Sequence, residues 1–294
     1  MEERSFVDSH GVEVFTYWWP VAEPKGIVVI SHGASEHAAR YDRFALALNA
    51  AGFAAAGIDH RGHGRTAAST GGGRMGAGGG DAVIDDLHEL RLAAEASVGA
   101  GVPTFLFGHS LGSLFGLAYL TRHSAGLAGG ILCGFPADPG GASSMRDLMQ
   151  TMATPDTRDQ PLESLGDFNS AIEGARTSAD WLSRDEAEVD KYIADPMCGD
   201  GNPLTYGYVA DFFGLVAQAA DQLGDIRCPM LVIAGDQDPA AAMGAHPAAL
   251  AEALKGAGVT ADLTLYPGAR HELLNETNRD DVTADIVGWL EARL

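Results

Sequence analysis

The chain has 294 residues, of which 46% are hydrophobic, so it is long enough for one large domain with a substantial core, alone or with an insertion. Its 40 acidic and 19 basic residues give a formal net charge of −21, which repels phosphate backbones and anionic lipids, so no nucleic-acid partner is expected. The opening stretch MEERSFVDSHG lacks a basic or apolar leader, and no run approaches the roughly 18 apolar residues of a spanning helix. These features predict a cytoplasmic protein without stable membrane insertion.

Short apolar runs alternate with longer amphipathic segments along the chain. Aliphatic runs bounded by Gly or Pro are typical of strands that are buried on both faces. The predicted strands cover residues 13–20, 26–33, 52–62, 104–110, 127–134, 230–238 and 261–268, and the predicted helices cover residues 41–51, 81–98, 111–123, 247–256 and 280–294. This alternation predicts βαβ units, a mostly parallel sheet flanked by helices, and hence an α/β fold.

One interval interrupts the alternation. Residues 135–222 contain helical patches, prolines and glycines but no convincing strand. Open α/β sheets bind their ligands at the carboxyl ends of the strands, so an insertion there would cover the site. We therefore expect a core domain formed by residues 1–134 and 223–294, with residues 135–222 as a helical cap.

The motif GHSLG at residues 108–112 lies between a predicted strand and a predicted helix. In a G-x-S-x-G elbow, a strained strand-to-helix turn lifts the serine hydroxyl out of the sheet, and the flanking glycines avoid collisions. The pattern alone is weak, but here a strand precedes it and a helix follows it. Ser110 is therefore the predicted nucleophile.

A serine nucleophile needs a base, and the base needs an orienting acid. Asp238 follows the strand MLVIAG and His271 follows the strand LTLYPG, so both are expected at the same sheet edge as Ser110. The chain order Ser, Asp, His is that of α/β-hydrolases. Two other carboxylates are alternatives to Asp238 as the acid. Asp236 lies two residues before it, and Asp138 follows the end of another predicted strand.

Acyl transfer also needs hydrogen-bond donors for the developing oxyanion. The backbone N–H of Leu111 at the helix start is one candidate, and the loop HGASEHAARY places Ala34 as the other. His32 and His37 in this loop have an unsuitable spacing for a metal pair, and the three cysteines form no paired metal motif. We expect neither a metal nor an organic cofactor.

Five ordered motifs carry a resemblance to a known family: HGASEHAARYDRFA, DHRGHGRT, GHSLGS, GDQDP and YPGARHELLNE. The chain resembles the monoacylglycerol lipase and lysophospholipase branch of the α/β-hydrolase superfamily from about residue 8 to the C-terminus. The resemblance implies a serine hydrolase with Ser110, Asp238 and His271 as triad, Ala34 and Leu111 as oxyanion donors, and a small-molecule ester with one acyl chain as substrate. Thr66 departs from the family pattern, where serine usually follows RGHG and one further residue.

The cap offers candidate pocket walls. Met145, Leu148, Met149 and Met152 share one helical face, which either packs on the core or lines an acyl pocket. The tentative substrate-binding residues are Met145, Met149, Tyr206 and Phe212.

Three alternative functions stay open beside this interpretation. The first is a carboxylesterase for short-chain or aromatic esters, the second another reaction on the same scaffold, and the third a non-catalytic binding protein. The apolar face of the cap allows transient contact with a lipid surface, and the sequence assigns no oligomeric state.

Overall fold

A single sheet with the strand order β1-β2-β4-β3-β5-β6-β7-β8 forms the centre of the protein. The structure is a computed structural model that describes residues 1–99, 101–163 and 166–294; positions 100 and 164–165, which fall in the predicted core and cap, lie outside the described residues. β1 and β2 are antiparallel to their neighbours, and the strands from β4 to β8 run parallel. The strands are β1 (Glu2–Val7), β2 (Glu13–Trp19), β3 (Gly26–Ser31), β4 (Phe53–Ile58), β5 (Thr104–His109), β6 (Leu127–Cys133), β7 (Met230–Gly235) and β8 (Ala261–Tyr266).

The predicted α/β class and mostly parallel sheet are confirmed. Strands β3, β4, β5 and β7 are buried at every position, which is why each of them appears in the sequence as a continuous apolar run. The sequence analysis missed β1, because this edge strand is exposed at nearly every position and carries no apolar run. It pairs with β2 from Glu2 opposite Trp18 to Val7 opposite Glu13.

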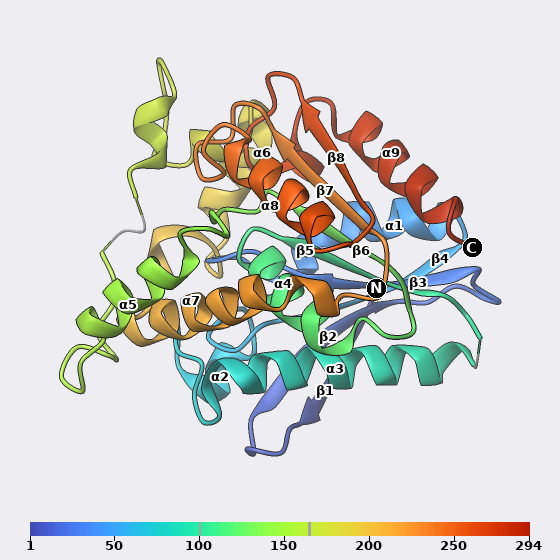
Figure 1. The fold of residues 1–294 in the computed structure, drawn as a ribbon, viewed down its shortest axis with the longest axis horizontal. Coiled ribbons are helices and arrows are strands. Elements are labelled where there is room, and N and C mark those ends of the chain that lie inside the picture. The colour runs from blue at the N-terminus through green and yellow to red at the C-terminus, as the bar shows by residue number, and fades with distance from the viewer. Residues whose placement is uncertain (100, 164–165) are drawn as a thin grey trace.

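Helices cover both faces of the sheet (Figure 1). One buried cluster includes side chains from α3, α4, α7 and α8, and a second cluster on the other face includes side chains from α1 and α9. The helices are α1 (Asp42–Ala50), α2 (Ala67–Thr70), α3 (Gly79–Val98), α4 (Leu111–His123), α5 (Ala142–Met152), α6 (Glu186–Ala194), α7 (Tyr206–Asp221), α8 (Ala245–Gly256) and α9 (Arg279–Glu291), and the short 3-10 turns are η1 (Ala38–Tyr41), η2 (Phe168–Ala171), η3 (Asp180–Leu182), η4 (Gly199–Gly201), η5 (Leu223–Asp225) and η6 (Leu273–Asn275).

The chain between β6 and β7 is helical wherever it has regular structure. Its described residues hold α5, α6, α7 and four 3-10 turns, and the β pairing among them is a single bridge between Pro161 and Thr205. Helix α7 packs against α5, α4 and α3, and it runs beside α5 along one face of the sheet (Figure 1). Within the described part of the chain, no helix combines the length and the apolar composition that a membrane crossing requires.

Candidate active site

Ser110 occupies a strained turn between β5 and α4. Its backbone has φ 52° and ψ −119°, a conformation that is unfavourable for a residue with a side chain. A Cβ at Gly108 would lie 2.4 Å from the Gly112 carbonyl oxygen, and a Cβ at Gly112 would lie 2.1 Å from that of Ser31. Only glycine fits at either position, so the two glycines of GHSLG let β5 and α4 approach closely enough to form the elbow.

Asp238 and His271 form a buried hydrogen-bonded pair at the carboxyl ends of β7 and β8. His271 Nδ1 lies 2.8 Å from Asp238 Oδ2, and the two residues are 2% and 0% exposed. The other carboxylate oxygen, Oδ1, accepts hydrogen bonds from the backbone N–H groups of Ala240 (2.9 Å) and Ala241 (3.2 Å). Both oxygens of Asp238 are thus fixed, and its carboxylate holds the histidine with Nδ1 as the donor.

The two other carboxylates considered as the acid point elsewhere. Asp236 Oδ1 accepts from the backbone N–H of Gly268 at 2.7 Å, inside the turn after β7. Asp138 is exposed, and its Oδ1 accepts from the Gly140 N–H at 3.0 Å. Of the three, Asp238 is the carboxylate that bonds His271.

A cavity of about 480 Å³ joins these elements. Ser110 and His271 both line it, and so do Ala34 and Leu111. Leu111 is the first residue of α4, where the N–H groups of the first turn lack intrahelical acceptors. The structure therefore brings the predicted nucleophile, base and oxyanion donors to one space.

The cap residues suggested as pocket walls divide into two groups. Phe212 of α7 lines the cavity. Met145, Met149 and Tyr206 are not among its lining residues: Met145 is 40% exposed on α5, Met149 is buried in the core cluster, and Tyr206 packs at the edge of that cluster. The helical period correctly placed the methionines on α5, but it could not show which neighbour that face meets.

The structure adds a cavity residue that sequence reasoning missed. Trp181 of η3 lines the cavity, with its ring 4.9 Å from that of His271. On the other side, the His109 ring also lies 4.9 Å from His271. The sequence does not predict the contact between Trp181 and His271, because the two residues lie 90 positions apart and no motif surrounds Trp181.

A layer of buried polar residues supports the loop that carries Ala34. Asp59 accepts from the backbone N–H of Ala38 (2.9 Å) and of Arg65 (2.8 Å). Thr66, the departure from the family pattern, accepts from the Phe15 N–H at 2.9 Å through its hydroxyl, a bond for which serine has the same oxygen. His60 lies under the same loop, because its Nε2 lies 2.8 Å from the Ser31 hydroxyl and its backbone N–H donates to His32 Nε2 at 3.0 Å.

We expect His63 to make the stability of the fold depend on pH. Burial lowers the pKa of His63 from 6.5 to about 4, so between these values the unfolded chain binds a proton that the folded chain excludes, and stability is lost as the pH falls. At about pH 5 this effect lowers the free energy of unfolding by about 2 kcal/mol. His63→Gln lacks this loss, because glutamine does not titrate. The free energy of unfolding that separates the parent protein from His63→Gln, measured by urea unfolding, should therefore be about 2 kcal/mol smaller at about pH 5 than at about pH 7.5.

His10→Gln provides the matched control, because it makes the same substitution at an exposed position. A stability difference between His63→Gln and the parent protein that is the same at both pH values would contradict the buried, neutral state of His63.

One group of side chains in the described ranges combines donors that could hold a metal ion: His37, Asp195 and Cys198. His37 Nε2 already lies 2.9 Å from Asp195 Oδ2, and the Gly199 N–H donates to the Ser35 carbonyl at 2.9 Å. These contacts connect the segment after α6 to the Ala34 loop directly. We assign no metal to the group.

Comparison with known proteins places this geometry in a family. Residues 22–278 match the family described as serine aminopeptidase, S33. The chain is 30% identical over 295 aligned positions to a monoacylglycerol lipase of Mycolicibacterium smegmatis, covering 99% of this chain and 98% of that protein. It is 28% identical to the human monoglyceride lipase, covering 98% of this chain and 89% of that one.

The solved structures agree with this placement. A highly thermostable carboxyl esterase from Bacillus coagulans, solved in complex with glycerol, superposes with a TM-score of 0.89 at 31% identity, covering 99% of this chain and 98% of that one. A lipase solved in an open form gives a TM-score of 0.86 at 29% identity, with 99% and 98% coverage. The chain belongs to the serine aminopeptidase S33 family, in the monoacylglycerol lipase-like branch of the α/β-hydrolases.

Proposed function

We propose that this protein is a serine esterase that hydrolyses carboxylic esters with a single acyl chain, through an acyl-enzyme on Ser110. One observation carries the proposal: the elbow serine, His271 with its buried partner Asp238, and the residues Ala34 and Leu111 come together because Ser110, His271, Ala34 and Leu111 all line one cavity of about 480 Å³. The names of the relatives, monoacylglycerol lipase and carboxyl esterase, support ester hydrolysis as the reaction.

The proposed mechanism follows from these contacts. His271, oriented by Asp238 through Nδ1, takes the proton of the Ser110 hydroxyl at Nε2 while the serine oxygen attacks the ester carbonyl. The N–H groups of Ala34 and Leu111 stabilise the negative oxygen of the tetrahedral intermediate. Protonated His271 then gives its proton to the departing alcohol. Water, activated by the same histidine, hydrolyses the acyl-enzyme and frees the acid.

We propose that residues 135–222 act as a cap over this cavity, on a core formed by residues 1–134 and 223–294. Several cavity-lining residues belong to this segment, among them Trp181 and Phe212. The backbone bond between Gly199 and Ser35 ties the cap to the loop of the proposed oxyanion donor, so a movement of the cap would also affect that loop.

The lining of the cavity favours an amphiphilic ester. Apolar side chains of the lining come from α4, α7 and the residues that flank them, and four polar side chains, those of Glu163, Asp167, Asn169 and Ser178, come from the cap segment. The apolar set on and near α4 and α7 is Leu111, Leu114, Pro136, Leu204 and Phe212. We propose that the acyl chain lies along this set and that a small polar alcohol occupies the cap side.

We expect kcat/KM for p-nitrophenyl esters to rise from acetyl to a maximum between octanoyl and dodecanoyl. Each buried methylene contributes up to about 0.8 kcal/mol, which is at most about fourfold in kcat/KM per methylene until the cavity is full. A cavity of about 480 Å³ lies in the usual range for binding one small ligand. The measurement is the initial rate across the series, together with glycerol release from a monoacylglycerol.

A maximum at acetyl or at aromatic esters would move the assignment to the carboxylesterase alternative with the same nucleophile. An aminoacyl p-nitroanilide serves as the peptidase control, because the family is described by an aminopeptidase. Turnover of the anilide with no turnover of any ester would contradict the proposed function.

A further inference from the structure

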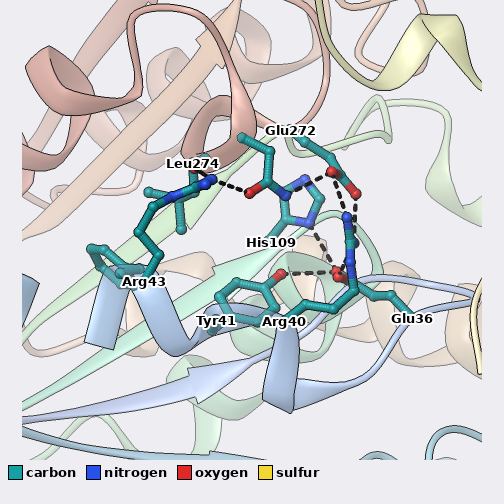
Figure 2. Close-up of a pocket in the computed structure, with 9 residues that line it drawn as sticks. Glu36, Arg40, Tyr41, Arg43, His109, Glu272 and Leu274 are labelled. Carbon is teal, nitrogen blue, oxygen red and sulfur yellow. Dashed lines mark hydrogen bonds and ion pairs between the residues drawn. The ribbon is translucent and has the colours of Figure 1, made fainter. Parts of the chain in front are cut away.

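A compact charged cluster lies beside the proposed active site, between the Ala34 loop and the His271 loop. Figure 2 shows Glu36 where Tyr41, Arg40 and His109 meet. Glu36 Oε1 accepts from the Tyr41 hydroxyl (2.8 Å), and Arg40 bonds both Glu36 (2.5 Å) and Glu272 (2.7 and 2.8 Å). The three side chains of Glu36, Arg40 and Glu272 are largely buried, with exposed fractions of 3%, 12% and 6%.

His109, the residue before Ser110, bridges the two loops. Its Nδ1 lies 3.3 Å from Glu36 Oε1, and its Nε2 lies 3.3 Å from the backbone carbonyl oxygen of His271. A carbonyl oxygen can only accept a hydrogen bond. Glu36 is equally confined to accepting, because the Gly33 N–H (2.6 Å), the Tyr41 hydroxyl and Arg40 all donate to its carboxylate.

We infer that His109 is a buried imidazolium that clamps the Ala34 loop to the His271 loop, and that it is a positioning residue for the proposed reaction. A neutral imidazole carries one N–H and one bare nitrogen, so one of its two bonds would set a lone pair against an oxygen. Only the doubly protonated ring satisfies both contacts. The positioning role of His109 rests on the proposed function, whereas its charge state does not.

The charge balance of the cluster agrees with this assignment. Glu36 and Glu272 are two buried carboxylates that share one guanidinium, that of Arg40, so a second cation is needed to neutralise the group. His109 is 6% exposed and provides that charge. The titratable and charged groups that surround it are Glu36, Arg40, Tyr41, Arg43, His271 and Glu272, and of these Arg43 is paired with Glu188 instead of with the cluster.

The pKa directions are consistent with the geometry. Burial alone lowers the pKa of His109, but its bond to Glu36 and the negative charges of Glu36 and Glu272 outweigh burial and raise that pKa above 6.5. Burial likewise raises the pKa of Glu36, yet Arg40 and His109 hold it well below its usual range. The raised pKa thus favours the protonated clamp, and the proton is lost as the pH rises through the raised pKa of His109.

Gly33 packs tightly against both the clamp and the nucleophile. A Cβ at Gly33 would lie 2.7 Å from Glu36 Oε1, 3.1 Å from His109 Nδ1 and 3.2 Å from Ser110 Cβ. The oxyanion loop therefore touches both the clamp and the nucleophile. Losing a bond from His109 should displace Ala34 or His271 relative to Ser110, and a misplacement of about 1 Å can lower a rate by about a hundredfold.

The direct test is long-range ¹H–¹⁵N NMR of the full chain with ¹⁵N-histidine at pH 7, with the His109 signal identified by its absence in His109→Gln. Two protonated ring nitrogens are expected in the parent protein. Glu36→Gln removes the carboxylate without changing its size, and it should return the His109 ring to the neutral pattern at pH 7. A single neutral tautomer in the parent protein at pH 7 would overturn the inference.

The catalytic consequence is read from kcat and KM separately. His109→Gln is expected to lower kcat by about tenfold to a hundredfold with little change in KM, and to remove the decline of kcat at alkaline pH that loss of the His109 proton causes. His123→Gln, on the far end of α4, is the matched control. An unchanged kcat in His109→Gln would overturn the positioning role, whereas inactivity of the parent protein toward every ester would count against the proposed function and leave the NMR result standing.

Discussion

Replacing Ser110 with alanine is expected to lower kcat for an octanoyl ester by about five orders of magnitude or more, because the covalent route disappears with the hydroxyl. Binding and the oxyanion donors survive, so a residual rate above that of water should persist. The fold should survive as well, since the Ser110 backbone N–H still donates to the Cys133 carbonyl at 2.9 Å and alanine keeps the Cβ that the elbow already accommodates.

Two measurements check this result. The first compares kcat and thermal unfolding of Ser110→Ala with those of Ser97→Ala, whose hydroxyl bonds the Ala94 carbonyl within α3 and is not among the residues that line the cavity. The second is covalent labelling by a fluorophosphonate, with the modified peptide located by mass spectrometry. Folded Ser110→Ala that keeps more than a small percentage of the parent activity would refute the nucleophile, as would a label on another serine.

The elements predicted correctly from the sequence are those whose residues all share one environment. Strand β5 is buried at all six positions, and this burial can be read from the apolar run FLF within TFLFGH. The elbow is also predictable from the sequence, because a Cβ at Gly108 or Gly112 would collide with nearby backbone atoms and only glycine fits there. The edge strand β1 escaped detection for the opposite reason: almost nothing in it is buried.

The sequence could not show contacts that need the folded chain. Met149 and Phe212 are both buried helical residues of the cap segment and belong to the same core cluster, yet of the two only Phe212 lines the cavity. The choice depends on how α5 and α7 are oriented, which no helical period records. Glu36 and Glu272 are 236 positions apart, and only the pairing of both with Arg40 reveals them as one cluster.

Asp238→Asn tests the acid of the proposed triad, and the contacts of Asp238 specify how the variant should lose activity. Asp238 Oδ1 is held by the N–H groups of Ala240 and Ala241, so the amide oxygen of an asparagine would take that place and its NH₂ group would face His271 Nδ1. A donor at this position forces the histidine to accept at Nδ1 and to carry its proton on Nε2. The nitrogen that should receive the serine proton is then already protonated, and kcat should fall by about 10⁴-fold.

Asp138→Asn and Asp236→Asn are the matched controls, since each makes the same chemical change at a carboxylate that bonds a turn N–H away from His271. Both should retain most of the parent kcat. Because the hydroxyl of Ser110 is untouched in Asp238→Asn, raising the pH should restore part of the rate as hydroxide replaces the missing base, a recovery that Ser110→Ala cannot show. An active Asp238→Asn beside an inactive Asp138→Asn would transfer the acid to the loop after β6, and the 2.8 Å contact between Asp238 and His271 would then be structural.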